Sequence, residues 1–321
     1  MAAAPPAEAL EAAPLRRSLT RGRVCTELLS GGVAGCVAKT ATAPLARLTV
    51  LAQTSSLLSP STLAAAHHPS SGHGAFTDGG IVRGLRHIVR SEGVSALWKG
   101  NVCTLVHRFP CTGVNFLTVE MSKRCFSDLI ELHWWGKLLP GASAAVSSVA
   151  VCYPLEVVRT RLMARAGGRP AGDIHWWRSL FLLSREEGLA GMYRGVGLSL
   201  AVTVPSLATS FAVYAAIQEA AKARGLSELE VSFVAGGLAG IAGSALIFPL
   251  DVLRRRRQVM GMDASVPMRD WRQEARHILR SEGVVGFYRG LAPELAKVFP
   301  TVALTFMTYE QMRLLAKLWG L

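Results

Sequence analysis

A short pattern occurs three times in this chain and divides its 321 residues into thirds. Each copy is a Glu-Gly pair followed by an aromatic residue, a basic residue and a glycine, and successive copies are 95 residues apart. The copies are Glu92-Gly93 with Trp98-Lys99-Gly100, Glu187-Gly188 with Tyr193-Arg194-Gly195, and Glu282-Gly283 with Tyr288-Arg289-Gly290. A fixed period of this kind indicates one structural unit built several times. We therefore expect three copies of one structure about a common axis.

A proline follows an apolar run upstream in each third, at Pro44, Pro154 and Pro249. A proline inside a helix removes one backbone donor, clashes with the preceding turn and kinks the helix. Three kinked helices can converge at one end and close a cavity. The first two prolines are 110 residues apart and the last two 95 apart, so the first third carries an insertion. We assign it to a polar, flexible loop over 54–76.

The composition favours a membrane protein that handles anions. Half of the residues are hydrophobic, the mean hydropathy is +0.31 and only 18% are charged, against about a quarter in soluble domains. A net charge of +13 suits nucleic acid, an anionic membrane surface or anionic substrates, and the apolar background favours the last two. The basic run 254–257 lacks interleaved aromatic residues, so we expect no nucleic-acid partner.

We expect no metal site and no cofactor. The six cysteines form no CxxC pair, and neither they nor the eight histidines show ligand spacing. We interpret the cysteines as reduced, apolar packing residues. His67, His68 and His73 lie in the expected loop and are interpreted as solvated side chains.

Six stretches are candidates for membrane-spanning helices, and we predict an all-α membrane protein with six spans in three pseudo-symmetric repeats around a central cavity. The spans are 26–53, 101–126, 135–163, 196–221, 230–258 and 291–318; the repeats are 26–127, 128–222 and 223–321, after a flexible tail over 1–25. The spans mix small and polar residues with apolar ones, which suits closely packed helices. Amphipathic segments at 79–91, 176–186 and 271–281 predict three short helices on the membrane surface.

The basic residue and glycine that end each copy predict a lipid site. The glycine precedes a span, and backbone N–H groups at a helix start bind phosphate. We therefore expect Lys99 with Gly100, Arg194 with Gly195, and Arg289 with Gly290 to hold a lipid phosphate, with cardiolipin as the expected lipid.

From residue 26 to 318 the chain resembles the mitochondrial carrier family. A proline-centred motif, a later [D/E]-G and an aromatic-basic-Gly stand in each third, and the proline motif has its full form, P-x-[D/E]-x-x-[K/R], in the second and third copies. The resemblance implies six tilted helices around a cavity that opens alternately to each side of the mitochondrial inner membrane. It places the three short helices on the matrix side, and we expect a monomer.

The resemblance also implies two gates of cross-repeat ion pairs, and this chain departs from both. The first copy has Ala46 and Thr49 in place of an acid and a base. On the matrix side the gate residues are Glu156, Arg159, Asp251 and Arg254 with the bracing Gln53 and Gln258. Of their pairs only Glu156–Arg254 should survive, and Met163 replaces the middle glutamine.

The cytoplasmic gate shows a parallel loss, since Ala215 and Gln218 replace its middle charges. Its residues are Glu120, Lys123, Glu310, Arg313, Tyr214 and Tyr309, with Val119 in place of the third tyrosine. Glu310–Lys123 should be its one cross-repeat pair. We hypothesise that both gates are weakly locked and that neither conformation dominates.

Charges inside the predicted spans mark the expected cargo site, because an intramembrane charge is costly. Equivalent positions differ among the thirds, as a site for an asymmetric solute requires. The predicted contacts are Lys39, Thr40, His107, Arg108, Val202, Thr203, Glu294 and Lys297. Cations outnumber the single acid, which favours a solute with several negative charges, such as a phosphate ester.

We predict a transporter that moves a phosphorylated anion of coenzyme A or adenine-nucleotide type by alternating access. The stretches 43–49, 107–110 and 297–300 resemble the branch of coenzyme A, adenine-nucleotide and ATP-Mg/phosphate carriers. Alternatives are a carrier of another anionic cofactor, such as thiamine diphosphate, and a membrane scaffold without transport. No nucleophile–base–acid set is visible, and Gly195-Val196-Gly197 lacks the third glycine of a dinucleotide fold. We expect no enzymatic activity.

Overall fold

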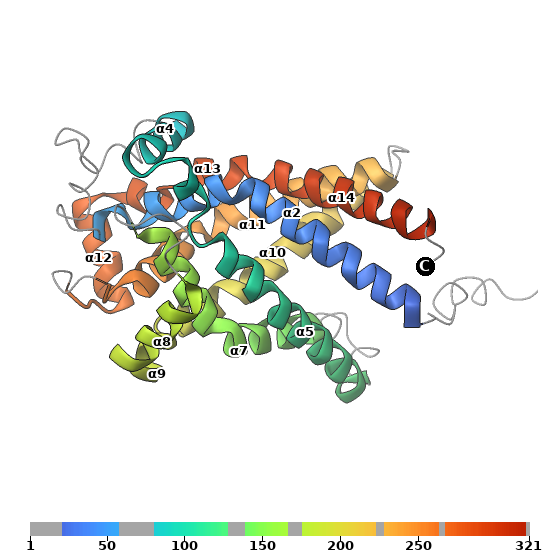
Figure 1. Cartoon of the computed structure of the whole chain (residues 1–321), viewed down its shortest axis with the longest axis horizontal. Coiled ribbons are helices and arrows are strands. Elements are labelled where there is room, and N and C mark those ends of the chain that lie inside the picture. The colour runs from blue at the N-terminus through green and yellow to red at the C-terminus, as the bar shows by residue number, and fades with distance from the viewer. Residues whose placement is uncertain are drawn as a thin grey trace, which may run out of the picture. The chain divides into compact units, whose positions relative to one another are not determined.

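The computed structural model describes residues 21–57, 80–127, 139–165, 175–222, 228–262 and 267–318, and within these ranges it contains helices and turns but no strand. The long helices are α2 (Arg21–Thr54), α5 (Asn101–Cys125), α7 (Leu139–Ala164), α10 (Val196–Lys222), α11 (Glu228–Val259) and the pair α13 (Leu291–Ala296) and α14 (Val298–Leu318) (Figure 1). They confirm the six predicted helical stretches. Most of the predicted tail and of the loop over 54–76, with its three histidines, lies outside the described residues.

The sixth predicted stretch is divided at Lys297, between α13 and α14. Pro300 stands three residues later and cannot donate a backbone hydrogen bond to Ala296. Thr301 resumes the helical pattern by donating its backbone N–H to the carbonyl of Lys297 at 3.0 Å. The missing bond weakens the helix at this point, although Pro110 and Pro205 at the equivalent positions lie inside the continuous helices α5 and α10.

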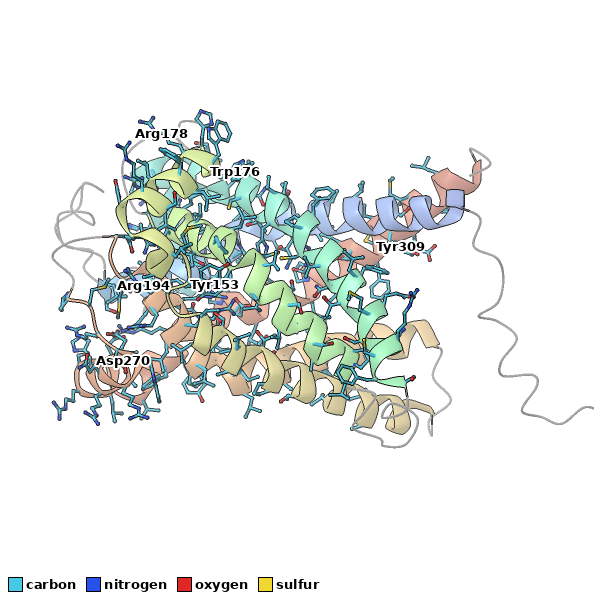
Figure 2. The ribbon with its side chains drawn as sticks, turned by 90° about the horizontal axis from the view of Figure 1, so that it is seen from below. Tyr153, Trp176, Arg178, Arg194, Asp270 and Tyr309 are labelled. Atoms are coloured by element: carbon cyan, nitrogen blue, oxygen red, sulfur yellow. The ribbon has the colours of Figure 1, made fainter. Side chains whose placement is uncertain are left out.

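The three amphipathic segments form α4 (Gly80–Glu92), α8 (Trp176–Glu186) and α12 (Trp271–Ser281), within one residue of the predicted bounds. Each buries a few apolar side chains: Ile88 on α4, Leu183 on α8 and Ile278 on α12. Asp270 and Gln273 form a capping box at the start of α12 (Figure 2). The remaining short elements are α9 (Gly188–Met192), η1 (Ser55–Leu57), η3 (Val94–Trp98) and η6 (Val284–Tyr288).

Contacts group the chain into two units, residues 38–303 and the segments 1–37 with 304–321. The second unit comprises the first part of α2 and most of α14. Within the larger unit, α5 packs along α7 and α10 packs along α11 (Figure 1). Pro44, Pro154 and Pro249 lie inside α2, α7 and α11, as predicted. Among the described residues, one helix, α7, is long and apolar enough to cross a membrane when length and composition alone are considered.

Three buried glutamate triads join the repeats beside the amphipathic helices, and each consists of the glutamate of the Glu-Gly pair held by two cations. The triads are Glu92 with Arg47 (2.8 Å) and Lys99, Glu187 with Arg161 and Arg194 (2.7 Å), and Glu282 with Arg256 (2.8 Å) and Arg289 (2.5 Å). Burial alone would raise the pKa of Glu92, but Arg47 and hydrogen bonds from Lys99 and Arg47 outweigh this effect and lower the pKa.

The arginine of each triad also reaches the next repeat. The Nε of Arg161 donates to the carbonyl of Gln258 (2.9 Å), and the Nε of Arg256 donates to the carbonyl of Gln53 (2.9 Å). The Nε of Arg47 donates to the carbonyl of Met163 at 3.4 Å, which closes the cycle. Gln53 and Gln258 were predicted to brace the gate, and Met163 stands in place of the middle glutamine. Each arginine therefore fixes its own helix, its own glutamate and the neighbouring helix.

The first triad obtains its arginine from one helical turn earlier than the other two. Arg161 and Arg256 stand seven residues after their prolines, whereas Arg47 stands three residues after Pro44. Leu51 occupies the equivalent position in the first repeat and packs in an apolar cluster around Ile88. Arg47 nevertheless binds Glu92 with its side chain fully buried, because residues four apart lie on the same face of a helix.

The glycine after each second triad cation permits a close backbone crossing. Gly100, Gly195 and Gly290 have φ values of 79°, 85° and 86°, a region that other residues rarely adopt. A Cβ on Gly290 would lie 3.0 Å from the carbonyl oxygen of Thr49, and one on Gly100 would lie 3.3 Å from that of Arg159. These glycines let each repeat pack against the first long helix of the next repeat: Gly100 lies against α7, Gly195 against α11 and Gly290 against α2.

We predict that Arg47→Leu destabilises the protein by about 3–5 kcal/mol, because it leaves the buried Glu92 with Lys99 alone. The double variant Arg47→Leu with Leu51→Arg should recover much of the loss, since it moves the cation to the register of the other repeats. Thermal unfolding of the purified protein in detergent measures both, with Arg83→Ala on the exposed face of α4 as the control. A double variant no more stable than Arg47→Leu would contradict the register argument.

Candidate functional site

One cross-repeat ion pair closes the site at the converging ends of α7 and α11. Arg254 donates to Glu156, which confirms the single pair expected on the matrix side. Gln258 supports it, since its Nε2 donates to Glu156 Oε1 at 3.1 Å and to the Tyr153 hydroxyl at 3.3 Å. Thr160 fixes the orientation of this amide by donating to Gln258 Oε1 at 2.8 Å. Gln258 therefore braces the pair as predicted.

The second predicted brace, Gln53, does not act as one. Its side-chain amide is buried without a hydrogen-bond partner among the described residues, and its backbone carbonyl binds Arg256 instead. The physical reason is the loss of charge in the first repeat: with Thr49 in place of a base, Asp251 has no cross-repeat ion pair for Gln53 to support. Asp251 instead binds Arg255 on its own helix at 3.0 Å.

Arg159 is the cation that the sequence change at Ala46 leaves without a partner. The family resemblance pairs this arginine with an acid at position 46, and alanine stands there. In the part of the chain that the structure describes, Arg159 forms no ion pair, and its Nε is buried without a hydrogen-bond partner. The acid that acts on it most strongly is Glu156, which is already paired with Arg254. The charge of Arg159 is therefore only partly compensated, and such burial is costly. Arg159 was predicted as a gate residue whose cross-repeat acid is missing, and the structure agrees with the missing pair; its role in a gate stays a prediction.

Two small neighbouring hollows lie beside Arg159. The first has a volume of about 100 Å³ and lies against the Glu156–Arg254 pair, and the second has a volume of about 20 Å³ and lies against α2 and α5. Arg159 and Lys297 line both hollows. Lys39 lines the smaller hollow and Arg255 lines the larger one. The structure thus brings Lys39 and Lys297 to a shared polar space, as predicted.

Cations outnumber acids around these hollows. Lys297 Nζ lies 2.6 Å from Glu294, and Arg255 lies 3.8 Å from the same carboxylate. Lys39 forms no ion pair with the residues described, and the charges closest to it are mainly cationic. Glu294 therefore balances one of several positive charges. The arrangement suits a ligand with more than one negative group.

The other predicted contact residues do not line the two hollows. Thr40 is occupied within the fold, since its carbonyl accepts from Trp98 (2.9 Å) and its hydroxyl accepts from Asn101 (3.2 Å). The Thr203 hydroxyl donates to the carbonyl of Ser199 at 2.7 Å. Val202 is buried, and Arg108 is exposed.

His107 contacts Cys111, and Cys152 lies beside both. The sequence was expected to contain no His–Cys cluster, so this grouping is a correction. His107 and Cys111 are four residues apart on one helix, a spacing visible in the sequence. Cys152 comes from another helix, and its proximity depends on the fold.

The triad arginines are the functional residues that sequence reasoning missed. Arg161 and Arg256 stand at one fixed distance from their prolines, and this regularity was an available signal. The triads also show what the side chains of Lys99, Arg194 and Arg289 bind, namely glutamates. The lipid phosphate expected at the backbone N–H groups beside them stays a prediction. Arg194 is further held at the carbonyl of Met260 (2.5 Å), and its own carbonyl accepts from Tyr153 (2.8 Å; Figure 2).

The cytoplasmic gate stays a prediction. Glu120 and Arg124 form an exposed pair on α5 at 3.3 Å, and Lys123 lies beside them in sequence. The side chains of Tyr214 and Arg313 lie outside the described part of the structure. Glu310 and Tyr309 belong to the smaller unit.

We predict that Glu156→Ala costs more stability than Asp251→Ala. Removing Glu156 leaves Arg254 beside Arg159 without its cross-repeat partner, and breaking a buried pair costs about 3–5 kcal/mol. Asp251 forms pairs within its own helix, which contribute about 1 kcal/mol or less. Thermal unfolding of the two variants provides the comparison. Equal losses of stability in the two variants would show that the cross-repeat pair stabilises the protein no more than the pairs within one helix.

Sequence comparisons identify relatives along the whole length of the chain. The family described as "Mitochondrial carrier protein" matches three stretches, residues 21–129, 131–224 and 227–317. The mitochondrial adenine nucleotide transporter ADNT1 of Arabidopsis thaliana is 31% identical, over 90% of this chain and 86% of the relative. The mitochondrial substrate carrier family protein P of Dictyostelium discoideum is 32% identical, over 88% of this chain and 92% of the relative.

A third relative is the mitochondrial adenyl nucleotide antiporter SLC25A25 of Homo sapiens. It is 31% identical over 89% of this chain, which covers 58% of that longer protein. The three matched stretches, the helices and the proline-centred motifs agree. The chain therefore belongs to the mitochondrial carrier family, whose members are multi-pass, all-α proteins of the mitochondrial inner membrane.

Proposed function

We propose that this carrier moves a multiply phosphorylated anion of adenine-nucleotide or coenzyme A type across the mitochondrial inner membrane by alternating access. The observation that carries the proposal is the unpaired Arg159 at two hollows that it shares with Lys297, next to the unpaired Lys39. The proposal includes no catalytic step and no cofactor.

Arg159 and the two lysines have complementary roles toward such an anion. A guanidinium presents a planar fork that binds two phosphate oxygens at once, whereas an ammonium acts as a compact point charge. Arg159 would hold one phosphate group beside the gate. Lys39 and Lys297 would neutralise the remaining charge across the smaller hollow.

The gate supplies the coupling between binding and conformational change. Glu156–Arg254 is the one cross-repeat pair among the described gate residues. At an effective dielectric constant of about 20, two charges 4 Å apart attract by about 4 kcal/mol. A phosphate at Arg159 lies next to this pair and competes with Glu156 for Arg254. Binding would weaken the closed gate, because a ligand shifts an equilibrium toward the state that it binds better.

The names of two relatives support the nucleotide assignment. One is called an adenine nucleotide transporter and another an adenyl nucleotide antiporter. Both names fit a multiply phosphorylated anion and exchange across the membrane. A thiamine diphosphate carrier and a scaffold without transport are less well supported, since a scaffold has no need of buried, unpaired cations at a hollow.

We further propose that the carrier acts as a monomer and binds cardiolipin at the start of the second span of each repeat, where α5, α10 and α13 begin. The side chains of Lys99, Arg194 and Arg289 are used in the triads, so lipid phosphate would meet the backbone N–H groups after Gly100, Gly195 and Gly290. No nucleic-acid partner is proposed.

We predict that liposomes containing the protein take up radiolabelled adenine nucleotide or coenzyme A, and that Lys39→Ala lowers the initial rate about tenfold to hundredfold. A lost charge-assisted hydrogen bond of about 1.5–3 kcal/mol gives this range. Arg83→Ala, which removes an exposed cation on α4, serves as the control. Normal uptake by Lys39→Ala would refute the cargo site. Uptake of thiamine diphosphate in preference to both solutes would refute the nucleotide assignment.

Ala46→Asp provides the sharpest test of Arg159. The new carboxylate would supply the partner that the family places at this position. We expect about a tenfold rise in KM for the transported anion and a higher apparent Tm, because Arg159 becomes paired. Ala46→Asn has nearly the same size without charge and should change both values little. Unchanged KM in Ala46→Asp, with the protein folded, would show that Arg159 does not bind cargo.

A further inference from the structure

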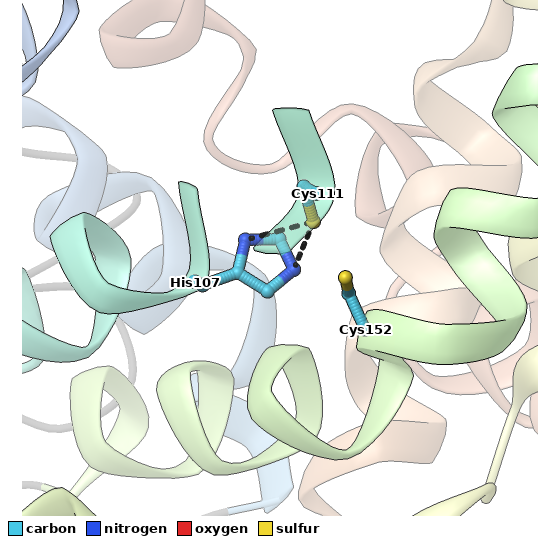
Figure 3. A group of neighbouring side chains, drawn as sticks. All are labelled: His107, Cys111 and Cys152. Carbon is cyan, nitrogen blue, oxygen red and sulfur yellow. Dashed lines mark hydrogen bonds between the residues drawn. The ribbon is translucent and has the colours of Figure 1, made fainter. Parts of the chain in front are cut away.

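Three soft metal ligands meet between α5 and α7, at the interface of the first and second repeats. His107 and Cys111 lie four residues apart on α5 and so share one face of the helix. Cys152 comes from α7 and faces them (Figure 3). Cys111 Sγ lies 3.2 Å from His107 Nε2, and the ligand atoms of all three residues lie within 4.8 Å of one another.

We propose that His107, Cys111 and Cys152 form a binding site for a thiophilic divalent metal ion of the zinc type. Zinc binds sulfur at about 2.3 Å and prefers tetrahedral geometry, so two coordinated sulfurs lie about 3.8 Å apart. Because no two of the three ligand atoms are more than 4.8 Å apart, the two sulfurs need to approach each other by about 1 Å at most to reach this spacing. Two cysteines and one histidine leave a fourth position open, as in zinc sites that exchange a ligand.

Charge balance selects a divalent ion. Two thiols each lose a proton to water when they coordinate, and the histidine stays neutral, so Zn²⁺ with two thiolates carries no net charge. A neutral complex is compatible with a low-dielectric position in the middle of two membrane helices. A monovalent ion such as Cu⁺ with two thiolates would form a complex with a net charge of −1.

The interface around the cluster is held on both sides, which fixes the two helices at the spacing the ligands need. Cys103 Sγ lies 3.5 Å from the carbonyl oxygen of Leu155 on one side. The hydroxyls of Ser122 and Ser143 lie 2.5 Å apart on the other. Cys152 is only 2% exposed. A bound ion would cross-link the two repeats through coordination bonds to α5 and α7, and the His107 side chain would then serve as a metal ligand.

The test is a titration of the purified full-length carrier with Cd²⁺ under reducing conditions, read by the ultraviolet absorption of the cadmium–thiolate bond. We expect one saturable site. Cys152→Ser and Cys111→Ser should each lose at least half of the absorption and bind Cd²⁺ more weakly by about tenfold or more. Cys125→Ser, which changes an exposed cysteine on the same α5 helix, should match the unmodified protein.

A second measurement guards against misfolded variants. Zn²⁺ should raise the apparent Tm of the unmodified protein, because a bound ion stabilises the folded state. Cys111→His keeps a metal ligand, so it should retain a Zn²⁺-induced rise while losing part of the cadmium–thiolate absorption. Lack of a saturable signal in the unmodified protein would overturn the proposal. The proposal would also be overturned if the folded Cys111→Ser and Cys152→Ser variants gave the same cadmium–thiolate absorption as the unmodified protein.

Discussion

The requirement that a buried charge find a partner organises this carrier. Three carboxylates stand at the C-terminal ends of the amphipathic helices, and each is held by two cations in a glutamate triad. One cation of every triad also binds a backbone carbonyl of the next repeat. The cycle of contacts fixes the ends of α2, α7 and α11 relative to one another, and those ends carry the gate and the hollows.

The first repeat departs from its partners twice, with opposite results. Its triad arginine stands one turn early, yet the triad forms, because Arg47 reaches Glu92 from the same face of α2. Its gate charges are absent, and no described residue replaces them. With Thr49 and Ala46 at these positions, Asp251 pairs within its own helix, and Arg159 has no ion pair among the residues that the structure describes. The triads thus form in spite of a shift in register. The gate, in contrast, loses its three-fold symmetry, and the Arg159 cation is left without its cross-repeat acid. In the function proposed above, this cation binds a phosphate group of the solute.

The sequence predicted the helices, the repeat and the Glu156–Arg254 pair, because these depend on periodicity and on motifs with fixed spacing. It did not predict the triads, since a glutamate and its arginine lie 26 to 45 residues apart and Arg47 breaks the spacing. Lys99 was assigned to lipid because a basic residue before a helix start is typical of phosphate binding. The proximity of Cys152 to His107 depends on the packing of α5 against α7, which no local pattern contains.

The sequence also could not show that Gln53 lacks a partner, because that depends on what its neighbours bind. Gln258 and Gln53 stand at equivalent positions, and only the first supports an ion pair. The difference arises from residues on other helices. Equivalent positions in a repeat protein therefore share a backbone environment without sharing a role.

An experimental structure of the carrier with a bound adenine nucleotide tests the central claim most directly. We predict phosphate oxygens within hydrogen-bond distance of the Arg159 guanidinium and of Lys297. Phosphate density located elsewhere, with Arg159 paired to a protein carboxylate, would contradict the account.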